Sequence, residues 1–401
     1  MKILFISSRL PHAEVISGHQ IVYQRIRRLS ARGHEIGLAV LGSEDDSEHI
    51  PEVRKIVSEL EVRPRPAPVF LLTRALRNVF SRIPPRFRPV YSPELFKCVG
   101  DMVEKSRYDV VVAEFGLMGQ YLNRNPYMPA VRKVISVHHC HTISSRQSVD
   151  LLGYSPRAIP EWFAYRRLRD FEFEMFRCAD HVLVLTPEER YSILNDAPDL
   201  RMTVVPSGVD TTVFEPEPNA NREEALLFTG YYNDQPNRDA VMWFCNTVWR
   251  KLKKKRPDLV FYVVGPDPSH AMRELARKDP SIIVTGWVED IRPYLAKAKV
   301  FVCPNRLGSG MRGKVLQAMA SGVPVVATTL GAEGIPIQMG NNGFLADKPA
   351  IIAQYIDLLL SDPVLHRGIA ERAREMVVER FSWERSIDVF EKILSDVIAG
   401  R

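Results

Sequence analysis

The chain has 401 residues, of which 45% are hydrophobic and 25% charged, and its net charge is +6. This composition is typical of a folded globular protein, and the length favours two domains over one. No apolar run approaches the ~20 residues that cross a bilayer, and the first strand-like segment is too short for a signal peptide. Five scattered cysteines without a Cys-x-x-Cys pair argue against disulfides and structural zinc. We therefore expect a cytoplasmic protein.

The positive charge is concentrated in one segment. Between Pro51 and Val90, nine basic residues stand against three acidic ones, an excess equal to that of the whole chain. Within it, the basic segment Val69–Val90 begins with Val69–Phe80, which interleaves large apolar groups with arginine at helical spacing. This pattern is typical either of an interfacial helix on an anionic membrane or of an ordinary helix with a solvated basic face. No nucleic-acid-binding motif accompanies the charge, so nucleic acid is not expected as a partner.

The N-terminal half alternates strand-like and helix-like segments. Strands are expected at Lys2–Ser7, Glu35–Leu41, Asp109–Glu114, Val131–Val137, Asp180–Thr186 and Met202–Pro206. Helices are expected at Gly18–Arg32 and Pro156–Ala179. Apolar strands alternating with helices predict a parallel sheet covered on both faces, which is a doubly wound α/β domain.

A second alternating series follows the polar linker Glu215–Asn221. Its expected strands are Ala225–Gly230, Leu259–Gly265, Ser281–Gly286, Lys299–Pro304 and Val323–Thr328. Its expected helices are Ala240–Arg256, Met272–Lys278, Ile291–Ala298 and Lys314–Ala320. We therefore predict two Rossmann-like domains in tandem facing a central cleft, residues 1–206 and 207–380. Residues 381–401 include a last helix that crosses back to the first domain.

The stretch Pro304–Gly334 carries the strongest functional signal. Glycines at positions 308, 310 and 313 allow a close approach to a ligand, and a helix opens directly after them near Lys314. Free N–H groups at such a helix start, with Arg312 and Lys314 beside them, form an anion site. Ligands of open α/β sheets collect beyond the carboxyl ends of strands, where Gly230 and Gly286 also lie.

Four stretches carry a resemblance to a known family: the opening stretch of the chain, Val204–Asp210, Gly230 with Asn237–Val241, and Val284–Asp290. Together they resemble the family-4 retaining glycosyltransferases of the GT-B fold, over almost the whole chain. The resemblance implies that the second domain holds a nucleoside-diphosphate sugar, linked to UDP or GDP, and the first domain an acceptor. It also implies transfer with retention through a front-face attack. With no Asp-x-Asp signature in the sequence, no metal or cofactor is expected.

The family's site residues transfer by position. Its ribose-binding glutamate falls on Gln317, and its glutamate near the donor sugar, eight positions earlier, falls on Ser309; both are departures. An arginine that many members carry after the first strand of this domain is Tyr231 here. Arg312 and Lys314 are then the expected diphosphate pair, helped by the N–H groups of two further residues of the loop, Gly310 and Met311.

The resemblance implies four further positions. Gly18 lets a helix start approach the diphosphate, and His138 faces the donor sugar from a strand end. Glu333 lies in a turn facing the sugar and phosphates, and the backbone of Gly286–Val288, which includes Trp287 and Val288, receives the base. Two residues also have interpretations without a functional role: Glu333 as a solvated turn residue, and Arg312 paired with a surface acid.

Other functions and acceptors also stay open at this point. The chain is expected to assemble cell-surface polysaccharide or glycolipid, because the basic segment favours a lipid-linked or saccharide acceptor at a membrane, although a soluble small acceptor fits too. A catalytically inactive nucleotide-binding scaffold is the main alternative, because both family glutamates are missing. A nucleotide-sugar epimerase is disfavoured, because Ser309 and Gln317 supply no carboxylate.

Overall fold

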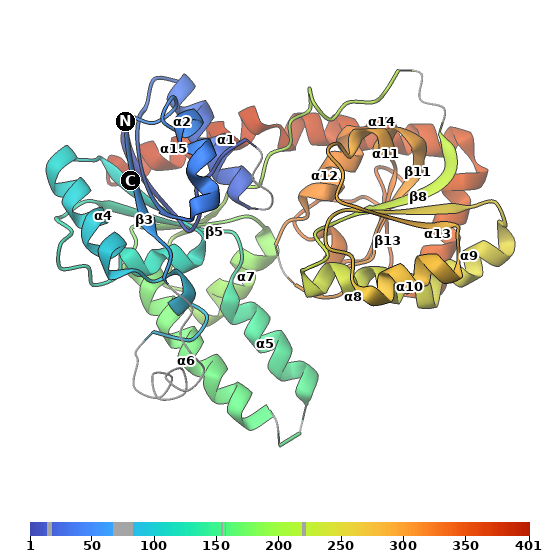
Figure 1. Ribbon diagram of the computed structural model, residues 1–401, viewed down its shortest axis with the longest axis horizontal. Coiled ribbons are helices and arrows are strands. Elements are labelled where there is room, and N and C mark those ends of the chain that lie inside the picture. The colour runs from blue at the N-terminus through green and yellow to red at the C-terminus, as the bar shows by residue number, and fades with distance from the viewer. Residues whose placement is uncertain (14–17, 67–82, 154, 157, 219–221, 309) are drawn as a thin grey trace. The chain divides into compact units, whose positions relative to one another are not determined.

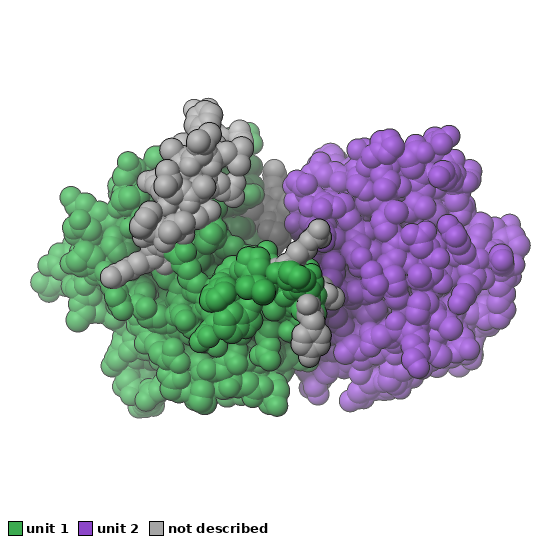
Figure 2. All heavy atoms as spheres, turned by 90° about the horizontal axis from the view of Figure 1, so that it is seen from below, with its two compact units in different colours: residues 1–205, 387–401 green, residues 206–386 purple. Residues whose placement is uncertain are grey.

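The computed structural model describes residues 1–13, 18–66, 83–153, 155–156, 158–218, 222–308 and 310–401. These residues form two compact units, coloured separately in Figure 2: unit 1 is Met1–Val205 with Ile387–Arg401, and unit 2 is Pro206–Ser386. Residues 69–82 of the basic segment Val69–Val90 lie outside the described residues. In the part of the chain that the structure describes, no helix is both long and apolar enough to span a bilayer.

Unit 1 is built on a seven-stranded sheet with the order β3-β2-β1-β4-β5-β6-β7, and all of its neighbours are parallel. The strands are β1 Lys2–Ser7, β2 Glu35–Gly42, β3 Glu59–Pro64, β4 Val110–Glu114, β5 Arg132–Val137, β6 His181–Val184 and β7 Met202–Val204. In the register, Ile3 pairs with Ile36 on one side and with Val110 on the other. The parallel arrangement places all the carboxyl ends at one edge, where ligands bind in such sheets.

Helices cover both faces of this sheet (Figure 1). They are α1 His19–Ala31, α2 Ile50–Val53, α4 Pro93–Ser106, α5 His141–Leu152, α6 Ala158–Arg177 and α7 Pro187–Asp196. Neither α4 nor α7 is among the predicted helices, although each begins with a proline after a hydroxyl residue and α4 carries an apolar stripe at helical spacing. The Ser92 and Thr186 hydroxyls accept hydrogen bonds from the N–H groups of Leu95 and Glu189, as N-caps do.

The last helix, α15 (Trp383–Ile398), packs into the core of unit 1 with its apolar stripe, as predicted. The Phe390 ring lies 6.3 Å from that of Phe5 on β1. The chain up to Ser386, which includes the first turn of α15, belongs to unit 2. There, Ser382 pairs with Val209, and the Ser386 hydroxyl donates to the carbonyl of Pro206. The chain thus changes unit after Val205 and again after Ser386.

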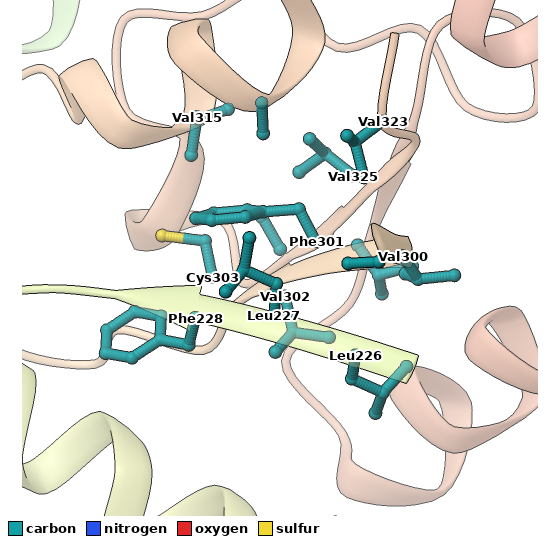
Figure 3. Close-up of a cluster of buried hydrophobic side chains, with 14 of the residues drawn as sticks. Leu226, Leu227, Phe228, Val300, Phe301, Val302, Cys303, Val315, Val323 and Val325 are labelled. Carbon is teal, nitrogen blue, oxygen red and sulfur yellow. The ribbon is translucent and has the colours of Figure 1, made fainter. Parts of the chain in front are cut away.

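Unit 2 contains a six-stranded parallel sheet with the order β10-β9-β8-β11-β12-β13. Its strands are β8 Glu223–Thr229, β9 Val260–Val264, β10 Ile282–Gly286, β11 Ala298–Cys303, β12 Val325–Ala327 and β13 Phe344–Leu345. Its helices are α8 Gln235–Phe244, α9 Arg250–Lys255, α10 His270–Lys278, α11 Arg292–Lys297, α12 Gly313–Ala320, α13 Pro349–Ser361 and α14 Pro363–Phe381. Figure 3 shows β8, β11 and α12 meeting in its core, where Phe228, Phe301 and Val315 are fully buried.

One predicted helix, Ala240–Arg256, differs in the structure. The helix begins five residues earlier, at Gln235, because Pro236 fits the first helical turn. It is also divided by a π-helical segment, Cys245–Trp249. Within that segment, the Thr247 hydroxyl donates to the carbonyl of Trp243 at 2.7 Å, a contact that competes with the regular helical ladder. Phe244 of α8 and Trp249 of the π-helical segment still pack on Phe261 of β9, with ring centres 5.0 and 5.7 Å apart.

Candidate functional site

Glycines line the carboxyl edge of the sheet in unit 2. Gly230 follows β8, Gly265 follows β9 and Gly286 ends β10. The N–H of Gly265 donates to the carbonyl of Gly286 at 3.1 Å, so neighbouring glycines are in contact. A Cβ at Gly265 would lie 1.9 Å from the Gly230 oxygen, and its φ is +140°, so glycine is required there. The edge therefore exposes backbone rather than side chains.

The loop before α12 adds further backbone groups. Gly308 and Gly310 have φ of +86° and +88°, values that side chains of L-residues rarely allow. The N–H of Gly310 donates to Glu333 Oε2 at 2.9 Å, so the structure brings these two predicted site residues together. The next residue, Met311, packs partly against the core. Ser309, the position of one family glutamate, lies outside the described residues.

Lys314, in the first turn of α12, is directed at this edge. Its Nζ donates to Asn237 Oδ1 at 2.8 Å and lies 4.2 Å from the centre of the Phe228 ring. A Cβ at Gly230 would lie 3.1 Å from Nζ. Burial lowers the pKa of the Lys314 ammonium to about 8, and the Arg312 guanidinium acts in the same direction. Near neutral pH the group is still mostly charged, so it suits an anionic ligand.

The other predicted residues of unit 2 have different surroundings. The Arg312 guanidinium donates to the carbonyl of Leu307 at 3.2 Å, which folds it over the glycine loop. Gln317 lies one turn after Lys314, and no described residue hydrogen-bonds its side chain. Trp287 is 67% exposed, whereas Val288 packs against the core. The predicted base-binding segment thus presents an exposed indole as well as backbone groups.

In unit 1, the side chain of His138 belongs to a buried network of charged groups. Its Nε2 lies 2.7 Å from Glu114 Oε2, and Arg25 Nη1 donates to both Glu114 oxygens at 2.8 and 2.9 Å. Arg25 and Glu114 are fully buried. Burial lowers the pKa of the His138 imidazole, although Glu114 acts in the opposite sense. His138 is therefore neutral near pH 7, and its Nε2–H donates to the carboxylate.

Gly18 adjoins the other nitrogen of this imidazole. A Cβ at Gly18 would lie 3.1 Å from His138 Nδ1 and 2.9 Å from the Phe115 ring, so glycine permits the close approach of α1. Nδ1 is buried and has no hydrogen-bond partner among the described residues. In the tautomer that Glu114 imposes, it is an acceptor. The structure thus brings together Gly18 and His138, and gives His138 a free acceptor.

Three residues near His138 were not predicted from the sequence: Arg25, Glu114 and His19. His19 is buried, and its Nε2 lies 3.0 Å from the Ser8 hydroxyl. Burial lowers the pKa of the His19 imidazole to about 3. A usable signal for Glu114 was present, because it ends an otherwise apolar strand. Two further histidines close to His138 in the sequence contact α5 instead: His139 Nε2 lies 2.8 Å from the Ser144 hydroxyl, and His141 begins the helix.

Acid is expected to destabilise the chain through Glu114. Burial alone would raise its pKa, but Arg25 and His138 outweigh burial and lower the pKa from 4.5 to about 2. Ionised Glu114 therefore stabilises the fold above pH 4.5, and this contribution, on the order of 3 kcal/mol, is lost as the pH falls towards 2. Urea titrations across that range measure the effect. Glu114→Gln removes the titration, and an unchanged pH dependence in this variant would contradict the assignment.

Among the residues described, no group of three or more His, Cys, Asp or Glu side chains is arranged to hold a metal ion.

Two family models match the chain: "Glycosyltransferase Family 4" over residues 19–213 and "Glycosyl transferases group 1" over residues 223–362. The UDP-Gal:alpha-D-GlcNAc-diphosphoundecaprenol alpha-1,3-galactosyltransferase of Escherichia coli is 22% identical, and the match covers 75% of this chain and 78% of that protein. D-inositol 3-phosphate glycosyltransferase of Arthrobacter sp. is 27% identical, with 78% and 77% covered. The solved sucrose-phosphate synthase of Thermosynechococcus elongatus aligns over 100% of both chains with a TM-score of 0.74 and 17% identity.

Two doubly wound parallel-sheet units, similar in structure to that synthase, are the architecture of a GT-B glycosyltransferase. The chain belongs to the family-4 type of glycosyltransferases, since the two family models together match most of its length. The predictions of fold, family and enzyme class are thus confirmed.

Proposed function

We propose that this glycosyltransferase moves a sugar from a nucleoside-diphosphate sugar to an acceptor hydroxyl with retention of configuration and without a metal ion. The observation that carries the proposal is the Lys314 ammonium at the glycine edge of unit 2. Its ammonium contacts an amide oxygen and an aromatic ring, and no described carboxylate forms an ion pair with it. A half-buried cation that forms no ion pair with a described carboxylate is suited to an anionic ligand.

The diphosphate is assigned to the start of α12. The positive end of the helix, with Lys314 and Arg312, attracts phosphate oxygens. During transfer the acceptor oxygen bonds to the anomeric carbon, the carbon–phosphate oxygen bond breaks, and the leaving diphosphate gains negative charge and takes up the acceptor's proton. Cations that are already fixed in place stabilise the charge that develops in the transition state more strongly than the smaller charge of the bound donor. Glu333, which accepts the N–H of Gly310, orders the loop that surrounds these groups.

His138 is assigned to a substrate hydroxyl through Nδ1, as the family resemblance implies. A neutral imidazole whose Nε2–H is held by Glu114 can accept a hydrogen bond only at Nδ1. Arg25 fixes the carboxylate and so fixes the orientation of the ring. Gly18 carries no side chain that would clash with the ring, since a Cβ there would lie 3.1 Å from Nδ1.

The donor is assigned to UDP- or GDP-linked sugars and the acceptor to a saccharide or lipid-linked saccharide at the cytoplasmic face of a membrane. The E. coli relative uses UDP-galactose and a diphosphoundecaprenol-linked acceptor by its name, which makes UDP-sugars the first donors to test. Gly286–Val288 are assigned to the base and Gln317 to the ribose, as the resemblance implies.

Replacing Gln317 with glutamate is expected to tighten donor binding about 5- to 10-fold, because a carboxylate accepts hydrogen bonds from a ribose diol more strongly than an amide does. The melting temperature should not change, because the side chain is partly exposed and no described residue hydrogen-bonds it. Calorimetric titration with the donor measures the effect, and Gln354→Glu on the exposed face of α13 is the control. An unchanged donor Kd would place Gln317 away from the ribose.

Retention and metal independence are tested together. The reaction is run with purified protein in excess EDTA, and the anomeric proton coupling of the new linkage is read by NMR. We expect undiminished transfer and the same anomeric configuration as in the donor. Inversion, or activity that returns only when Mg²⁺ or Mn²⁺ is added, would contradict the proposed mechanism.

A further inference from the structure

Helices α5 and α6 pack side by side and extend away from the sheet of unit 1 (Figure 1). We call this pair the helical arm. Its base joins the two helices: the buried carboxylate of Glu172 on α6 accepts hydrogen bonds from the N–H groups of His141 and Thr142 at 3.2 and 2.8 Å. These are two of the N–H groups at the start of α5 that no helical carbonyl can satisfy. The inner half of α6 packs into the core of unit 1 through Phe173 and Phe176, so the arm is anchored to that unit.

The outer half of α6 does not contribute to a core. None of the described residues from Ala158 to Arg167 is buried, whereas Leu168, Phe173 and Phe176 nearer the base are. Three large apolar side chains stand in this outer half with 61%, 41% and 64% of their surface exposed: Ile159, Trp162 and Phe163. Their spacing of three and four residues places them on one face of the helix. We call these three residues the apolar tip.

Arginines follow the apolar tip within two helical turns. The Arg166 guanidinium lies 4.8 Å from the centre of the Trp162 ring, a cation–π contact. Between Ala158 and Arg169 the chain carries three arginines and one acidic residue, Glu161. Aromatic side chains next to arginines are the composition of helices that lie at the interface of a lipid bilayer.

The size of the apolar tip decides between a bilayer and a protein partner. A stable protein interface needs about 800 Å² from each partner. Three side chains that are roughly half exposed, each offering at most about 150–250 Å² in full, supply about half of that. A bilayer needs no shape complementarity, because aromatic rings enter between headgroups while arginines bind lipid phosphates.

We propose that the apolar tip and Arg166 dock this enzyme on an anionic membrane surface. The proposal goes beyond glycosyl transfer, since it requires neither donor nor acceptor. It also differs from the interpretation of Val69–Val90, because it assigns the contact to described residues of α6.

The test is co-sedimentation of the full chain with phosphatidylcholine vesicles that contain one third phosphatidylglycerol, and with phosphatidylcholine vesicles alone. Wild type is expected to bind the anionic vesicles at least about tenfold more strongly than the neutral ones. The double variant Trp162→Ala/Phe163→Ala should lose at least about tenfold in affinity for the anionic vesicles, and Arg166→Glu about threefold. These side chains are exposed, so the melting temperature should be unchanged.

Tyr191→Ala is the matched control, because Tyr191 is an aromatic residue of unit 1 that is 70% exposed on α7; it should bind as wild type does. Quenching by brominated lipid gives a second measurement, in which Trp162→Phe should remove most of the quenched fluorescence. Three results would overturn the proposal: no binding by wild type, full binding by the double variant, or a concentration-dependent dimer that the double variant abolishes while vesicle binding stays absent.

Discussion

Lys314→Ala is expected to lower kcat/KM for glycosyl transfer by about 100- to 1,000-fold, the usual cost of removing one preorganised group that stabilises developing charge. Most of the loss should appear in kcat, because the ammonium binds the leaving diphosphate more strongly as its charge grows. The same variant leaves the Asn237 amide oxygen without the ammonium at the glycine edge. Steady-state kinetics with a saturating acceptor separate the two parameters.

Lys297→Ala is the matched control for this measurement, because Lys297 is an exposed lysine of the same unit, at the end of α11. It should retain wild-type kinetics. Thermal melting establishes that both variants are folded. Activity of Lys314→Ala within a few fold of wild type would remove this residue from the diphosphate site.

Glu114→Ala is expected to destabilise the chain by about 3–5 kcal/mol, because it leaves the fully buried Arg25 guanidinium without its counter-ion. Chemical denaturation measures the change. Glu104→Ala, at an exposed acid of α4, should cost less than about 0.5 kcal/mol. A small loss in Glu114→Ala would mean that another group or water compensates Arg25, and that the network does not hold His138.

The alternation of apolar strands and helices was enough to predict both parallel sheets, because buried parallel strands are continuous apolar runs. The elements that periodicity missed have weaker patterns. β3, Glu59–Pro64, is an edge strand in which one residue is buried, so it lacks an apolar run. β13 is two residues long.

The residues of the candidate site also fall into two groups, those that the sequence predicts and those that it does not. Gly230, Gly286 and the loop before α12 were predictable, because glycine and strand ends have a local signature. The partners of Lys314 were not predictable: Asn237 and Phe228 lie 77 and 86 positions away in the sequence and meet it only because β8 lies beside β11, which leads to α12. Arg25 and Glu114 are likewise brought together by β1 pairing with β4.

We propose that each unit binds one of the two substrates. Donor binding is assigned to unit 2 from Lys314 and the glycine edge, and acceptor binding to unit 1 from the family resemblance. A tighter donor Kd in Gln317→Glu, with wild-type donor binding in a variant of His139, would support this assignment.

The release of nucleoside diphosphate tests the account most directly. Purified wild-type chain is incubated with each of several UDP- and GDP-sugars and a saccharide or lipid-linked acceptor, and free UDP or GDP is quantified. The account predicts release from at least one donor that depends on the acceptor and is lost in Lys314→Ala. Nucleotide binding without release from any donor would contradict it and would favour a nucleotide-binding scaffold that has lost its activity.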